Sequence, residues 1–193
     1  MNVPAIRFSV DDAQLAADAW AANCGPGAVA AICGMTLDEL RPFLGDFERK
    51  RYTNPTLMWH ILVRLGVTWQ AARMGTLAWD LRETLWPRYG LARVQWEGPW
   101  TAPGVPMRAR YRHTHWVGAA ERATGLRIFD INCICVGGWV SADEWADHVV
   151  PWLLNECTPK ANGHWHLTHV VEIYEYAPAR KHILESAKGV EHA

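Results

Sequence analysis

Helix-like and strand-like patterns occupy different halves of this chain, and that order limits the folds open to it. The first half carries apolar residues at helical spacing, whereas the second half contains short runs with strand-like alternation. Helices first and strands afterwards favour an α+β fold with an antiparallel sheet. We therefore expect one domain over residues 1–193, with a helical lobe at about 10–90, a sheet lobe at about 91–176 and a tail at 177–193.

Local start and stop signals delimit the expected elements. Capping boxes begin at Thr36 and Ser141, and Gly34 and Gly66 follow segments with helical spacing. The expected helices cover 11–19, 24–33, 36–44, 56–65, 76–85 and 141–149. The expected strands cover 92–96, 115–120, 126–131 and 165–176. The turn at 121–125 joins two of these strands into a hairpin.

Composition excludes several classes of function. Hydrophobic residues make up 50% and charged residues 20% of the chain, as in soluble globular proteins. A net charge of −1 leaves no electrostatic footprint for nucleic acid or an anionic membrane, and no apolar run reaches membrane-spanning length. The five cysteines are an odd number, and the start of the chain has no signal-peptide pattern. Free thiols in a reducing compartment are therefore expected.

Cys24 has the surroundings of an activated thiol. It precedes Gly25-Pro26-Gly27 and a run of small residues, and proline suits the first turn of a helix. At a helix N-terminus the helix dipole and the free backbone N–H groups favour the thiolate, which is the nucleophilic form. The alternative is that Cys24 is a small core residue.

The hairpin supplies a base and a group to orient it. His115 begins one strand and Asp130 ends the next, so folding back about Ala123-Thr124 brings them together. His113 shares a strand face with His115, and Asn132 shares one with Asp130. We expect His115 and Asp130 to act, with Asn132 as the second candidate for orienting the base.

Two further clusters suggest metal ligands only weakly. His164, His166 and His169 do not converge on one strand face, so structural or surface roles are favoured. Cys133 and Cys135 are separated by one residue, whereas zinc motifs usually have at least two. We expect no metal and no cofactor.

Three motifs together resemble the papain-like cysteine peptidases. They are Asn23–Pro26, His115–Val117 and Phe129–Asn132, in the order in which that family carries its Cys, His and Asp or Asn. The three motifs are most similar to those of the bacterial group related to bacteriocin leader peptidases. Similar short proteins are common in phage and prophage genomes. The resemblance spans about residues 14–175 in motif order.

The resemblance implies a papain-like fold and a Cys24-His115-Asp130 triad. The family commonly has a Gln six residues before the Cys as an oxyanion-hole donor, whereas this chain has Asp18 there. An ionised carboxylate would repel an oxyanion. The donors considered are therefore Asp18 in its protonated form, the Trp20 indole, the Cys24 backbone N–H, and two amides, those of Gln14 and Asn23.

The expected function is thiol hydrolysis, as a cysteine peptidase that cleaves a peptide or isopeptide bond in a peptide or protein substrate. An amidase, a deamidase or an acyl transferase would use the same triad. A non-catalytic phage structural or interaction module on the same scaffold is the alternative from another class. The resemblance implies a cytoplasmic protein of bacterial or phage origin, with association with the virion as a variant of this expectation.

Overall fold

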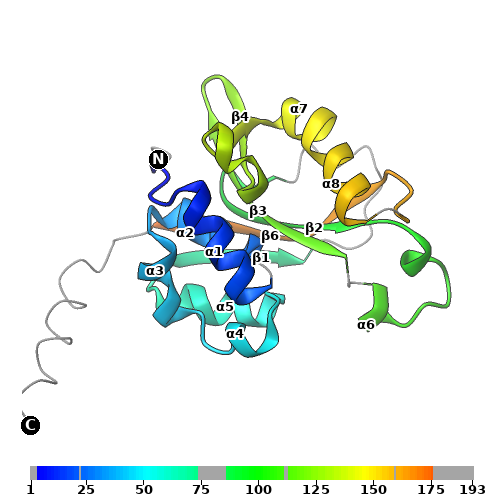
Figure 1. The fold of residues 1–193 in the computed structure, drawn as a ribbon, viewed down its shortest axis with the longest axis horizontal. Coiled ribbons are helices and arrows are strands. Elements are labelled where there is room, and N and C mark those ends of the chain that lie inside the picture. Colours follow the sequence, from blue (N-terminus) through cyan, green and yellow to red (C-terminus); the bar gives the residue numbers. More distant parts are fainter. Residues whose placement is uncertain (1–3, 22, 74–85, 111–112, 159, 176–193) are drawn as a thin grey trace, which may run out of the picture.

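A six-stranded antiparallel sheet is the frame on which the helices of this α+β fold pack (Figure 1). The computed structural model describes residues 4–21, 23–73, 86–110, 113–158 and 160–175. Its strand order is β1-β6-β2-β3-β4-β5, so the last strand of the chain lies between β1 and β2. The strands are β1 (Thr68–Arg73), β2 (Tyr89–Trp96), β3 (Thr114–Arg122), β4 (Gly125–Phe129), β5 (Trp139–Ser141) and β6 (Trp165–Glu175).

Helices from the first half begin and end at residue types that favour helix ends. Ser9 and Thr36 each form a capping box, Asn54 caps its helix through Leu57 N–H, and Gly34 ends a helix in the left-handed conformation. These helices are α1 (Val10–Trp20), α2 (Cys24–Cys33), α3 (Leu37–Leu40), α4 (Phe47–Lys50) and α5 (Pro55–Arg64). A 3₁₀ turn over Arg41–Phe43 follows α3.

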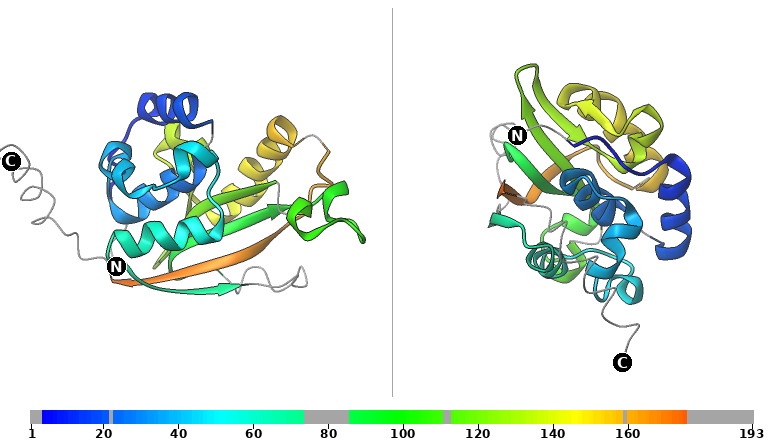
Figure 2. Two further views of the ribbon diagram at one scale, coloured as in Figure 1. Left: turned by 90° about the horizontal axis from the view of Figure 1, so that it is seen from below. Right: turned by 90° about the vertical axis from the view of Figure 1, so that its left-hand side faces the viewer.

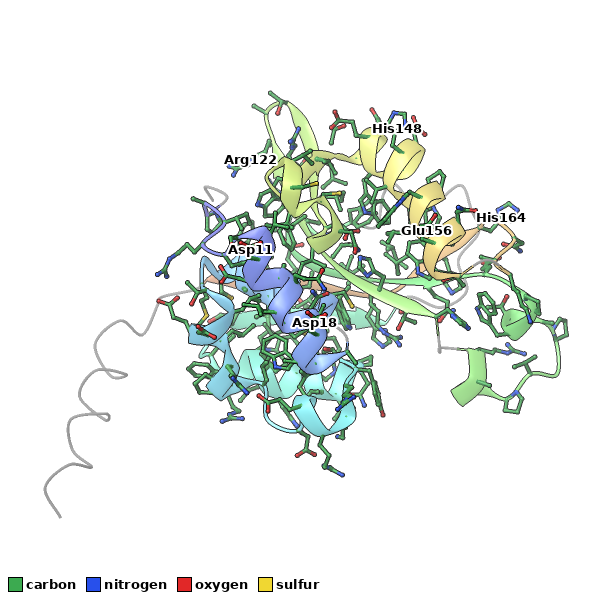
Figure 3. All side chains as sticks on the ribbon, in the orientation of Figure 1. Asp11, Asp18, Arg122, His148, Glu156 and His164 are labelled. Atoms are coloured by element: carbon green, nitrogen blue, oxygen red, sulfur yellow. The ribbon has the colours of Figure 1, made fainter. Side chains whose placement is uncertain are left out.

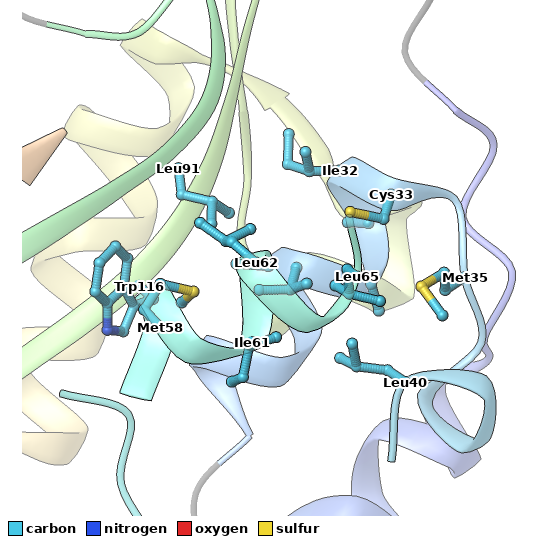
Figure 4. Close-up of a cluster of buried hydrophobic side chains, with 14 of the residues drawn as sticks. Ile32, Cys33, Met35, Leu40, Met58, Ile61, Leu62, Leu65, Leu91 and Trp116 are labelled. Carbon is cyan, nitrogen blue, oxygen red and sulfur yellow. The ribbon is translucent and has the colours of Figure 1, made fainter. Parts of the chain in front are cut away.

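Helix α2 lies deep in the larger of two cores, and small side chains allow it to approach the sheet closely. Ile32 lies against Gly118 of β3, where a β-carbon would come within 3.2 Å of the Ile32 side chain. Leu62 of α5, Leu65 directly after this helix and Leu91 of β2 belong to the same apolar cluster (Figure 4). Burial of this kind stabilises the fold by about 1.5–3 kcal/mol for each large apolar side chain.

The second core covers the opposite face of the sheet. Alternate residues Ala92 and Val94 of β2 and Val117 of β3 point into it, because successive strand residues face opposite ways. Its helical cover comes from the second half of the chain (Figure 2). That cover is one continuous helical run of α7 (Ala142–Glu144), a π-helical turn (Trp145–Val149) and α8 (Val150–Cys157).

Three expectations about the elements need correction. The division into a helical and a sheet lobe near residue 90 was wrong, because β1 comes from the first half and pairs with β6. The helix from Ser141 does not stop at Val149, because the π turn leads directly into α8, where Pro151 lies in the first turn. The strand expected at 126–131 ends at Phe129, and the chain then forms a 3₁₀ turn (Ile131–Val136) that contains Cys133 and Cys135.

Other expectations lie outside the described residues or concern smaller elements. The helix expected at 76–85 and the tail at 177–193 lie outside the described residues. Between β2 and β3 the chain forms a 3₁₀ turn (Pro99–Thr101) and the short helix α6 (Met107–Arg110). Within the described part of the chain, no helix combines the length and the apolar character needed to cross a membrane.

Candidate active site

Cys24 is the first residue of α2, as the Gly-Pro-Gly sequence after it predicted. Asn23 precedes the helix without capping it through its side chain, and Pro26 lies in the first turn. The backbone N–H groups of the first turn of a helix have no acceptor within the helix. The half-buried Cys24 thiol therefore lies at the positive end of the helix dipole.

His115 lies at the start of β3, where the strand is paired on one side. β2 pairs with β3 from Gln95 onwards, whereas β4 pairs with β3 only between Gly118 and Arg122. Because β4 ends at Phe129, the side of β3 at His115 is left open to the start of α2. In this stretch of β3 without a β4 partner, the His115 side chain and the Trp116 backbone N–H both contact Cys24.

The expected contact between His115 and Asp130 is present. His115 Nε2 lies 2.9 Å from Asp130 Oδ2, and both side chains are buried. The register Gly118↔Phe129 places the two residues at the same end of the β3-β4 hairpin. Because Nε2 faces the carboxylate, the second ring nitrogen, Nδ1, remains for the thiol.

Cys24 and His115 are also hydrogen-bonded to each other, and each shifts the pKa of the other. Burial raises the pKa of the Cys24 thiol, but the His115 bond, the His115 charge and the Trp116 backbone N–H outweigh it, so the pKa is lowered. Burial lowers the pKa of His115, but the charge and hydrogen bond of Asp130, aided by Cys24, raise it well above its usual value. These shifts favour a thiolate-imidazolium pair.

Asp130 is completely buried, and its two oxygens receive four hydrogen bonds. Oδ2 accepts from His115 and from the Trp145 indole at 2.9 Å, while Oδ1 accepts from the Asn132 backbone and side-chain nitrogens at 3.0 and 2.8 Å. Burial raises the pKa of this carboxyl group, but His115, Trp145 and Asn132 together lower it. Asn132 thus contacts Asp130 and holds the carboxylate that faces His115.

The side-chain donors considered for an oxyanion hole are bonded elsewhere. Gln14 Nε2 donates to Asp18 Oδ1 at 2.9 Å, and both residues are exposed on α1, where Figure 3 labels Asp18. Asn23 Nδ2 donates to the Ala13 carbonyl at 2.8 Å. The Trp20 ring is buried edge-on against Phe47. The Cys24 backbone N–H is the candidate donor that the helix itself supplies.

The remaining described thiols differ sharply from Cys24. Burial raises the pKa of Cys33 to about 12, and burial together with Asp130 and Cys135 raises that of Cys133 to about 12. Cys135 is exposed. Of the described cysteines, only Cys24 combines a lowered pKa with a neighbouring imidazole.

The histidine and cysteine clusters do not form a metal centre in the described structure. His113 lies over Trp100 with ring centroids 3.9 Å apart, and His166 Nδ1 lies 3.0 Å from Glu97 Oε1. Across the described ranges, no group of three or more His, Cys, Asp or Glu side chains is placed to hold a metal ion.

Several residues around the triad were not identified from the sequence. Trp145 binds Asp130, Trp96 stacks on His115 with centroids 6.2 Å apart, and Trp116 Nε1 donates to the Thr53 carbonyl at 2.8 Å. Thr53 in turn packs against Gly25, next to Cys24. The capping box at Ser141 fixed the start of the helix that carries Trp145, but nothing in the local sequence indicated which buried group that indole would meet.

No model of a known protein family matches this sequence, and no curated protein shows significant similarity to it. The interpretation of the site therefore depends on its own geometry.

Proposed function

We propose that this chain is a papain-like thiol hydrolase, a cysteine peptidase that cleaves a peptide or isopeptide bond. One observation carries the proposal: a cysteine with a lowered pKa at a helix N-terminus contacts a histidine whose opposite nitrogen binds a buried carboxylate. Nucleophile, base and orienting group in that order are what covalent acyl transfer requires.

The proposed reaction has two halves. The Cys24 thiolate attacks the substrate carbonyl carbon, the C–N bond breaks, and the His115 imidazolium gives its proton to the leaving amine. Neutral His115 then takes a proton from water, whose oxygen attacks the thioester, and the C–S bond breaks to restore the thiolate-imidazolium pair. Asp130 keeps the imidazole oriented and stabilises its charged form throughout.

Developing negative charge on the carbonyl oxygen needs a donor close to Cys24. The backbone N–H of Cys24 points from the N-terminus of α2, and the dipole of this ten-residue helix favours negative charge there. With Gln14, Asp18 and Asn23 bonded elsewhere, we assign the oxyanion to this backbone donor. The four free thiols Cys24, Cys33, Cys133 and Cys135 fit a reducing compartment such as a bacterial cytoplasm.

An electrophilic peptide probe and a cleavage assay test the proposal together. Incubation near neutral pH followed by peptide mapping should place the adduct on Cys24 and leave Cys33 and Cys133 unmodified, because burial keeps those two thiols protonated. A mixture of peptides analysed by mass spectrometry should show cleavage that Cys24→Ala abolishes.

The control variant is Cys135→Ala, which removes an exposed thiol outside the triad and should leave both labelling and cleavage unchanged. Labelling of Cys135 while Cys24 stays unmodified would refute the assignment of Cys24 as the nucleophile. A labelled Cys24 in a protein that breaks no peptide or isopeptide bond would refute the peptidase activity and favour the interaction module.

A further inference from the structure

The Trp145 indole takes part in the hydrogen bonding of the triad. Its Nε1 donates to Asp130 Oδ2 at 2.9 Å, and this is the same oxygen that faces His115 Nε2 at 2.9 Å. Trp145 has only 1% of its surface exposed and Asp130 has none, so water does not compete for this bond. A hydrogen bond to a buried charge is among the stronger ones in proteins.

Aromatic neighbours fix the direction of that N–H. Trp86 and Trp165 meet the Trp145 ring edge-on, with centroids 5.8 and 5.3 Å away and planes at 86° and 83°. Trp96 stacks on its face at 6.3 Å and also stacks on His115. With neighbours packed in both edge-on and stacked geometry, the indole cannot rotate away from the carboxylate without disturbing the second core.

The backbone around Trp145 adds to this placement. Ser141 and Glu144 form a capping box that fixes where the helix starts, and Trp145 follows as the first residue of the π-helical turn. π-helical turns are rare and occur frequently at functional sites. The helix therefore presents one side chain, Trp145, to the site at a defined position.

We propose that Trp145 is a positioning residue that tunes the base of the triad through Asp130. This inference rests on the proposed thiol chemistry. Because the indole N–H also interacts with the negative charge of Oδ2, the carboxylate binds the imidazolium proton less tightly. His115 must give up that proton to the leaving amine, and a base that binds its proton too tightly is a poor acid in that step.

The test is the substitution Trp145→Phe, which keeps an aromatic ring and removes the donor. The rate of Cys24 alkylation by iodoacetamide is measured against pH; it changes first where the thiol ionises and again where the imidazolium loses its proton. We expect the second change to move upward by about one pH unit, which is the scale of one hydrogen bond to a charged group.

The matched control is Trp152→Phe, which makes the same substitution at an exposed ring of α8. This control should leave the pH of the second change in alkylation rate the same as in the wild type. An unshifted or downward-shifted second change in Trp145→Phe would overturn the proposal. An unreactive Cys24 in the wild type would instead refute the proposed function, so the two failures are distinguishable.

A measurement on the wild type keeps the proposal testable if Trp145→Phe does not fold. In nitrogen-15 NMR spectra recorded against pH, the Trp145 indole N–H should shift with the ionisation of His115, because both donate to the same oxygen. The Trp139 indole, which has no acceptor among the described residues, is the internal reference. A Trp145 resonance that stays constant while His115 titrates would overturn the proposal.

Discussion

His115 and His113 are two residues apart on the chain, but their side chains have different surroundings. His115 lies between Cys24 and Asp130, while His113 lies over the Trp100 ring. Strand periodicity alone could not separate them, because residues two apart share a strand face. The end of β4 separates them, because the turn after Phe129 brings Asp130 to His115.

This difference predicts unequal effects of two alanine substitutions. His115→Ala removes the hydrogen bond and the charge that lower the pKa of Cys24, so the apparent thiol pKa should rise towards or above its ordinary value of 9.0. Alkylation of Cys24 at pH 7 should then slow by about tenfold or more, since each pKa unit is a factor of ten in thiolate. The measurement is the pH profile of alkylation.

His113→Ala is the control and should leave that profile in place. A profile that shifts with His113→Ala and not with His115→Ala would contradict the assignment of the base.

At the residue scale, the position of Cys24 at a helix start and the contact between His115 and Asp130 could be predicted, because each depends on short-range spacing. A helix start signal located Cys24, and the hairpin brought His115 and Asp130 within reach of each other. Trp145 could not be predicted, because its contact depends on how a distant helix packs. Asp18 has the spacing expected of an oxyanion-hole donor, but helix α1 leaves it exposed to solvent.

At the scale of elements, the start of α2 is held in place by the loop before α5. A methyl group at Gly25 would lie 2.6 Å from Thr53 Cβ. Thr53 cannot easily retreat, because its carbonyl accepts the buried Trp116 indole N–H at 2.8 Å. This arrangement connects the residue after Cys24 to the residue after His115.

Gly25→Ala should therefore destabilise the protein, although alanine normally favours a helix over glycine by about 1 kcal/mol. Overpacking against Thr53 should lower the free energy of unfolding in urea by roughly 1–3 kcal/mol and slow Cys24 alkylation. The matched control is Gly27→Ala, whose methyl meets Cδ1, the flexible end of the Ile131 side chain, at 2.5 Å and should cost less. A more stable Gly25→Ala protein would contradict this account.

Elements with strong local signals could be predicted, and elements that depend on distant partners could not. Helices α1, α2 and α5 carry caps and apolar spacing in their own sequences. β1 lacks such a signal, because its six residues become a strand by pairing with β6 about 100 residues later. The two halves of the chain therefore share one sheet.

At the scale of the whole molecule, the triad joins the two cores. Cys24 comes from the helix buried in the first core, whereas Trp145, which binds Asp130, belongs to the second. The hairpin that carries His115 and Asp130 lies between them. The arrangement of Cys24, His115 and Asp130 thus depends on packing on both faces of the sheet.

The thiolate-imidazolium pair also has a consequence for the proton balance of folding. In the unfolded chain near pH 8, the proton lies on the sulfur of Cys24, because a free thiol has the higher pKa. In the folded protein the lowered thiol pKa and the raised histidine pKa both favour that proton on His115. We therefore expect folding to move one proton from Cys24 to His115 with no net uptake or release by the pair near pH 8.

Cys24→Ala should break this balance. His115 alone then has a folded pKa above its unfolded value, held there mainly by Asp130, so its stabilising effect is complete below about pH 6.5 and is lost as pH rises through the folded pKa. The free energy of unfolding in urea should fall by up to about 1.4 kcal/mol per pH unit above pH 6.5. Between about pH 6.5 and the ordinary thiol pKa of 9.0, we expect the pair to contribute no such slope in the wild type. Equal slopes in the two proteins would mean that no proton is exchanged within the pair. A steeper slope in Cys24→Ala would mean that the Cys24 sulfur also sets how the fold responds to pH.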